Sequence, residues 1–157
     1  MAFNNTVLEE SIGLGSGEIL KTKPYNTEAF SIFEDGLVQG RFAKYEAGSI
    51  NNLNASTAPK ISGISRRLIA GETGVSTYRN TGAIVDSAAE VHTVGFATVD
   101  VVAGVTPAKY GIAYAENQTV GEYGKATTVA TGNIDSGWVF WEKVATNVWL
   151  VAKASLV

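Results

Sequence analysis

The run Glu90–Ala103, with the sequence EVHTVGFATVDVVA, carries the longest strand pattern in this chain of 157 residues. Side chains of a β-strand alternate between its two faces, and Val91, Ala97 and Val99 fall on one face of this run. Gly95 lies inside the run and indicates a β-bulge or the close approach of another backbone segment. We therefore predict a long strand here and interpret the rest of the chain around it.

The composition favours strands along the whole chain. Val occurs 17 times and Ile 10 times, against 8 Leu and 1 Met, and stiff β-branched side chains suit pleated surfaces. Gly, Asn and Pro separate the apolar runs, and Ala47–Pro59 is turn-forming sequence. Further strands are predicted at Leu37–Glu46, Ile61–Ala70, Gly82–Val85, Tyr110–Glu116, Lys125–Ala130, Gly137–Lys143 and Val148–Leu156. This spacing predicts an all-β fold, either a single-domain β-sandwich or a partly closed β-barrel.

The N-terminal region differs from the rest of the chain. Glycine occupies alternate positions from 13 to 17, which disfavours a persistent strand or helix there. We interpret residues 1–35 as an extended N-terminal arm and residues 36–157 as the β-domain, with short structured pieces at Val7–Ile12 and Ala29–Phe33. The alternative is that the region forms a first strand and a long loop of the same domain.

Composition excludes several classes of site. The chain has no cysteine, so it has no disulfide, no thiol nucleophile and no zinc site built on thiolates. Its single histidine, His92, excludes a multi-histidine metal site within one chain. We therefore expect no metal and no cofactor. A net charge of −3 argues against a nucleic-acid partner, which requires clustered positive charge.

The hydropathy pattern argues against a membrane partner. No apolar run approaches the ~18 to 20 residues that a membrane span needs, and the N-terminus lacks the pattern of a secretory signal. We expect synthesis in a cytoplasm. Only 17% of the residues are charged while 45% are hydrophobic, which raises the hypothesis that other chains cover part of the surface.

The motifs that resemble catalytic or phosphate-binding sites are each incomplete. His92 has Glu90 within reach on its strand face but no nucleophile elbow, and we interpret it as a histidine on a half-exposed strand face. The glycine-rich stretches 13–17 and 121–125 lack the spacing or the Ser/Thr of nucleotide-binding loops and are interpreted as turns. Glycoside hydrolysis needs two carboxylates that face each other across a cleft. The acid pairs Glu9-Glu10 and Glu34-Asp35 are sequence neighbours, and neighbouring side chains of a strand point to opposite faces. The chain is therefore not expected to be an enzyme.

The C-terminal aromatic run is more informative. In Gly137–Lys143, Trp138 and Phe140 share one strand face, while Val139 and Trp141 share the other. The following run alternates in the same way, so both strands carry bulky apolar side chains on both faces, which a strand solvated on one side would not do. The tryptophans then belong to a core, to a protein interface or to a stacking platform for sugars.

The adjacent pair Arg66-Arg67 lies in an otherwise apolar strand. Neighbouring side chains of a strand point to opposite faces, and a covered arginine requires a carboxylate partner. The pair is consistent with a salt bridge between subunits, and equally with one exposed arginine and one arginine at a sheet edge.

The order of these segments resembles the capsid cement, or decoration, proteins of tailed bacteriophages. The resemblance runs from Gly36 to the C-terminus. It is carried by GLVQGRFAKY at 36–45, APKISGISR at 58–66, the valine-rich run Val91–Val102, YGIAY at 110–114 and GNIDSG at 132–137. At the late strand, Pro107-Ala108-Lys109-Tyr110 replaces the Gly-Asp-Pro-Val type of step that is usual in that family.

The resemblance implies a non-enzymatic structural protein on the outer capsid surface of the virion. Such a protein bridges subunits of the major capsid protein, often as a homotrimer, and an extended arm would reach a neighbouring subunit. On this interpretation the contact residues are Phe3, Asn4, Asn5, Arg66, Arg67, Trp138 and Trp141. The alternative function is a carbohydrate- or receptor-binding β module that uses its tryptophans as stacking platforms.

Overall fold

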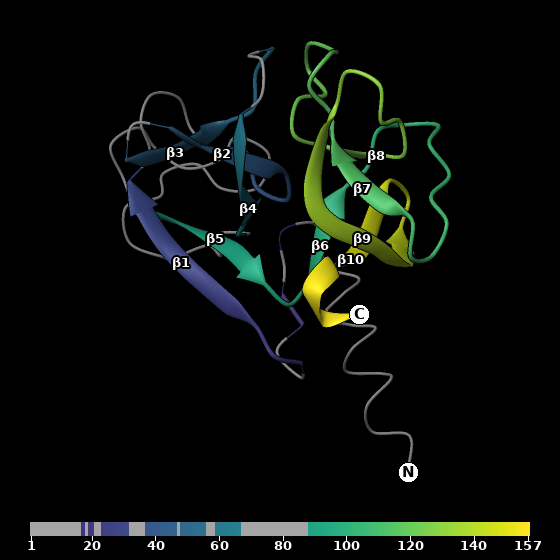
Figure 1. The fold of residues 1–157 in the computed structure, drawn as a ribbon, viewed down its shortest axis with the longest axis horizontal. Coiled ribbons are helices and arrows are strands. Elements are labelled where there is room, and N and C mark those ends of the chain that lie inside the picture. The colour runs from purple at the N-terminus through teal and green to yellow at the C-terminus, as the bar shows by residue number, and fades with distance from the viewer. Residues whose placement is uncertain are drawn as a thin grey trace.

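The fold is a sandwich of two five-stranded antiparallel sheets (Figure 1). The computed structural model describes residues 17, 19–20, 23–31, 37–46, 48–55, 59–66 and 88–157. The first sheet has the order β1-β5-β4-β2-β3, with β1 Asn26–Ser31, β2 Phe42–Glu46, β3 Ser49–Asn52, β4 Lys60–Ser65 and β5 Ala88–Val94. The second has the order β6-β10-β9-β7-β8, with β6 Phe96–Asp100, β7 Ile112–Ala115, β8 Ala126–Thr127, β9 Ile134–Ala145 and β10 Val148–Lys153. The all-β prediction is confirmed, and the only helical element of the described ranges is a short 3-10 turn at Ala154–Leu156.

The long strand predicted over Glu90–Ala103 is two strands in different sheets. β5 ends at Val94 and β6 begins at Phe96, so the chain crosses between the two layers at Gly95. Gly95 has a φ of +125°, and a Cβ there would lie 2.9 Å from the Cβ of Tyr25. The predicted close approach is confirmed. Apolar and polar residues alternate in the sequence on both sides of Gly95, which is why the pattern predicted one strand.

The main core lies between the sheets. The first sheet contributes Phe42 and Ile64, and the second sheet contributes the larger share, including Trp138, Phe140 and Val151. All five side chains are at most 1% exposed. Burial of this kind stabilises the fold by roughly 1.5–3 kcal/mol for each large aliphatic or phenyl side chain.

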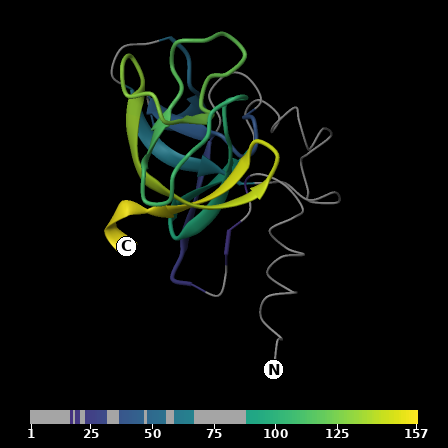
Figure 2. The ribbon, with the colours of Figure 1, turned by 90° about the vertical axis from the view of Figure 1, so that its right-hand side faces the viewer.

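The second sheet is also apolar on the face that points away from the first sheet. We call this face the outer face; its cluster contains Phe96, Leu150 and Ala152, against which Leu20, Val139, Trp141 and Val144 pack. Figure 2 views the molecule with the second sheet nearer the reader. The expectation that the last two strands carry apolar side chains on both faces is therefore confirmed.

Several strand boundaries differ from the predictions. Ser49–Asn52 was predicted to be turn and is strand β3, because Gly48, at φ +84°, closes a tight hairpin that pairs Ile50 with Tyr45. Strand β2 begins at Phe42, five residues after the predicted start at Leu37. The predicted strand at Gly82–Val85 lies outside the described residues, as does the end of the predicted strand Ile61–Ala70.

Two pieces of the predicted arm are described, and both contact the sheets. Strand β1 pairs with β5 along its length. Ile19 forms an isolated bridge with Ala97 of β6, flanked by backbone hydrogen bonds from Gly17 N to Thr98 O and from Leu20 N to Phe96 O. Residues 1–16 lie outside the described ranges, so the division into an arm and a β-domain at residue 35 stays a prediction.

Candidate functional site

An aromatic row crosses the outer face of the second sheet. The ring centroids of Tyr110 and Trp141 are 5.5 Å apart and those of Trp141 and Phe96 are 5.1 Å apart, both in edge-to-face geometry. Two lysines flank the row: the Nζ of Lys109 lies 4.2 Å from the Trp141 centroid, and the Nζ of Lys23 lies 5.9 Å from the Phe96 centroid. Both distances are in the range of cation–π interactions. We call these five residues the aromatic row and its lysines.

Tyr110 is held in an unusual backbone conformation at the exposed end of this row. Its φ is +68°, which is uncommon for a non-glycine residue, and its side chain is 61% exposed. The conformation is fixed by hydrogen bonds from Tyr110 N to Phe140 O and from Phe140 N to Gly111 O. Local strain of this kind persists only where surrounding contacts impose it, and it concentrates at functional sites. Neither Lys109 nor Tyr110 was among the predicted contact residues.

A row of apolar side chains lies beside the aromatic row. Ile112 of β7 is opposite Val139 of β9, Val139 is opposite Ala152 of β10, and Ala152 is opposite Phe96 of β6. Directly opposed residues of an antiparallel pair share a face, so these four side chains cross the outer face of the second sheet. Ile112 ends the row and is 42% exposed.

The two predicted tryptophans lie on opposite faces of β9, as their spacing required. Trp138 is fully buried in the core between the sheets, where the Nζ of Lys153 lies 5.5 Å from its ring centroid. Trp138 therefore packs inside this chain. Trp141 is half-buried on the outer face, with two ring edges and the Lys109 ammonium against it. These contacts occupy the ring and do not favour its use as a stacking platform for sugars.

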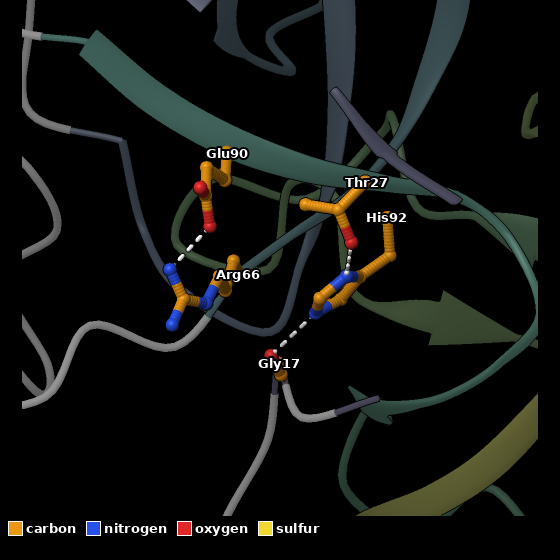
Figure 3. A network of polar contacts seen from close by, with 5 residues as sticks. All are labelled: Gly17, Thr27, Arg66, Glu90 and His92. Atoms are coloured by element: carbon orange, nitrogen blue, oxygen red, sulfur yellow. Dashed lines mark hydrogen bonds and ion pairs between the residues drawn. The ribbon is translucent and has the colours of Figure 1, made fainter. Parts of the chain in front are cut away.

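Arg66 has a carboxylate partner within the chain. Its Nη1 donates to Oε2 of Glu90, and its backbone N donates to the carbonyl of the same residue (Figure 3). This ion pair joins the end of β4 to β5 and leaves both side chains partly exposed. Arg67, Phe3, Asn4 and Asn5 lie outside the described residues.

His92 is buried, and the prediction of a half-exposed strand face is wrong. Its side chain is 1% exposed, because Gly17 and strand β1 lie against it (Figure 3). Nε2 lies 2.9 Å from Gly17 O, and Nδ1 lies 2.9 Å from the Thr27 hydroxyl. A carbonyl oxygen only accepts, so Nε2 donates to Gly17, and in the neutral ring the Thr27 hydroxyl donates to Nδ1. Both ring nitrogens are engaged in linking the N-terminal segments to β5.

The remaining motifs have structural roles. The stretch Gly121–Lys125 is a turn. It is closed by a backbone hydrogen bond from Lys125 N to Glu122 O and by an ion pair of 2.8 Å between Lys125 Nζ and Glu122 Oε2.

Across the part of the chain that the structure describes, no group of three or more His, Cys, Asp or Glu could hold a metal ion. No helix in those ranges is long and apolar enough to cross a bilayer. The acid pairs Glu9-Glu10 and Glu34-Asp35 lie outside them.

Comparisons with known proteins identify the family. No curated protein matches the chain. A chain of the solved structure titled "The capsid of Myoviridae Phage XM1" is similar to it, with 47% sequence identity, 98% coverage of each chain and a TM-score of 0.77. The family model described as XM1 gp53 minor capsid protein matches residues 3–154. The chain therefore belongs to the XM1 gp53 minor capsid protein family, and it is a structural component of a phage capsid rather than an enzyme.

Proposed function

We propose that this protein is a cement protein, which binds the outer surface of the assembled head and stabilises it by bridging subunits of the major capsid protein. Membership of a minor capsid protein family supports this role. The observation that carries the proposal is the outer face of the second sheet: its central cluster is buried by the chain's own side chains, but Tyr110 and Ile112 at its edge are 61% and 42% exposed. Apolar surface of this kind marks sites of protein–protein contact.

The proposed mechanism is multivalent bridging. Contacts spread over several capsid subunits must break together before a subunit is released, so modest interfaces resist internal pressure collectively. Trp141 and the partly exposed Arg66 would contribute to these contacts, whereas Trp138 would support them from the core. We further propose that the protein acts as a homotrimer and that Phe3, Asn4, Asn5 and Arg67 contribute contacts from the N-terminal arm and the segment after β4.

The test is rebinding of purified protein to heads that lack it. Sedimentation measures how much protein each head binds, and a pressure or heat challenge measures whether bound protein delays genome release. Binding to the outer surface with delayed release is expected. Heads that bind no added protein would contradict the proposal, as would protein located only on the inside of the shell by electron microscopy.

A second experiment tests the arm and the trimer. Deletion of Ala2–Ser16 retains Gly17, whose backbone pairs with β6 and accepts from His92. The deletion is expected to weaken head binding while the β-sheet circular-dichroism signal is retained, and loss of that signal would place the segment in the folded domain. Analytical ultracentrifugation of the intact chain is expected to give the mass of a trimer, and a monomer mass would contradict that part of the proposal.

A further inference from the structure

The outer face of the second sheet combines exposed apolar side chains with two lysines that have no carboxylate partner among the described residues. Lys109 and Lys23 are both exposed, and neither forms an ion pair with any residue of the described ranges. Glu142 of β9 lies opposite Leu150 and is therefore an exposed carboxylate on this face, yet it is not within ion-pair distance of either ammonium. The aromatic row thus has a cation near each end and, within the described ranges, no anion paired with either.

The two lysines are positioned rather than free. The Nζ of Lys109 lies 4.2 Å from the Trp141 ring centroid and 5.3 Å from the Tyr110 ring centroid, and the Nζ of Lys23 lies 5.9 Å from the Phe96 ring centroid. A lysine held by aromatic rings loses less side-chain entropy when it pairs with an anion than a lysine that is free in solvent. The arrangement is therefore preorganised to bind negative charge.

The exposed apolar side chains beside the lysines indicate what kind of partner carries the negative charge. Ile112 and Tyr110, 42% and 61% exposed, lie at one end of the face, next to Lys109 in the sequence. A small anion alone would leave these side chains in water, whereas a peptide would cover them and supply the charge together. Interface centres are typically apolar and aromatic with charged groups at the rim, which is the arrangement found here.

We propose that the outer face of the second sheet binds an acidic segment of a capsid subunit, which places apolar side chains over Ile112 and Val139 and carboxylates against Lys109 and Lys23. This inference names the partner chemistry of the proposed cement function and rests on that function. The positive charge of the two lysines, without carboxylate partners among the described residues, selects an acidic segment over a basic or neutral one.

The test compares charge variants in rebinding to heads that lack the protein. Lys109→Glu is expected to weaken binding about tenfold, because a like charge then faces the partner's carboxylates, while Lys109→Arg retains wild-type binding. Lys60→Glu is the matched control, because Lys60 is also exposed but lies at the start of β4 in the other sheet. Tyr110→Asn is expected to weaken binding about tenfold as well, since asparagine tolerates positive φ and removes only the ring.

The outcomes separate this inference from the function on which it rests. Failure of the wild-type protein to bind heads removes the cement function and the inference together. Equal binding by the wild type, Lys109→Glu and Lys60→Glu overturns the inference and leaves the function intact. If Lys109→Glu changes the oligomer mass in solution but not head binding, a second copy covers the face and the inference is wrong. Tryptophan fluorescence and circular dichroism of each variant establish that it is folded.

Discussion

Replacement of Gly95 by alanine tests the junction on which the two-layer architecture depends. The residue lies between β5 of one sheet and β6 of the other, at φ +125°. Alanine rarely adopts this conformation, at a cost of about 1–3 kcal/mol. The new Cβ would also lie 2.9 Å from Tyr25 Cβ and 3.1 Å from Pro24 O, neither of which is the mobile end of a side chain.

The expected loss of unfolding free energy for Gly95→Ala is about 3 kcal/mol, the strain and the steric contact together. A loss of that size is a large fraction of the roughly 5–15 kcal/mol that is typical of domains. Gly104→Ala is the matched control, because Gly104 has φ +81° and nothing within 4 Å of its hypothetical Cβ. The control carries the backbone strain without the contact, and it should cost about 1 kcal/mol.

The assay is equilibrium urea unfolding, followed by tryptophan fluorescence and circular dichroism at one fixed protein concentration. Coincident transitions would establish the two-state behaviour that the comparison requires. If Gly95→Ala is no less stable than Gly104→Ala, the close approach of residues 24 and 25 to the junction does not limit the fold, and the reasoning is refuted.

Three further predictions concern single side chains in the two layers. Trp138→Ala should lower the unfolding free energy by about 3–5 kcal/mol in urea titrations, because the ring is fully buried, and a loss below about 1 kcal/mol would contradict its place in the core. Glu46 has its pKa lowered from 4.5, chiefly by the side-chain hydrogen bond from Lys44 and then by the charge of that lysine. Because the folded-state pKa is lowered, the pair contributes stability at pH values above the unfolded-state pKa and loses it as the pH falls through the folded-state pKa. The urea midpoint of Glu46→Gln should therefore depend less on pH across this range than that of the wild type. An unchanged pH profile would count against the pair. His92→Phe should cost about 2–3 kcal/mol by leaving the Thr27 hydroxyl and the Gly17 carbonyl without their partner, and hydrogen exchange at Leu20 should accelerate; protection equal to wild type would show that His92 does not hold this segment.

The fold class could be predicted from the sequence because it depends on local alternation and composition. The pattern around Trp138 and Trp141 correctly assigned the two tryptophans to opposite faces, since a period of two has one outcome once the strand is known. Gly95 was recognised as a point of close approach from equally local information, because glycine inside an apolar strand pattern typically marks a bulge or a backbone contact.

The features that could not be predicted depend on contacts distant in the sequence. His92 is buried by Gly17 and Thr27, which lie more than sixty positions away, and no local pattern contains them. Strand β3 has the polar sequence Ser-Ile-Asn-Asn, and it becomes a strand only because β2 lies beside it. The aromatic row likewise unites Phe96, Tyr110 and Trp141 from separate segments, so no local pattern contains it.

The position of β10 in the second sheet has a consequence for synthesis of the protein. β10, the last strand of the chain, lies between β6 and β9, so β6 lacks its neighbour until Val148–Lys153 has been translated. At about 5–20 residues per second, the ribosome needs roughly a few seconds to go from β6 to β10. Ala152 completes the apolar row between Val139 and Phe96. The outer face of the second sheet is therefore complete only after β10 has been translated and has paired with β6 and β9.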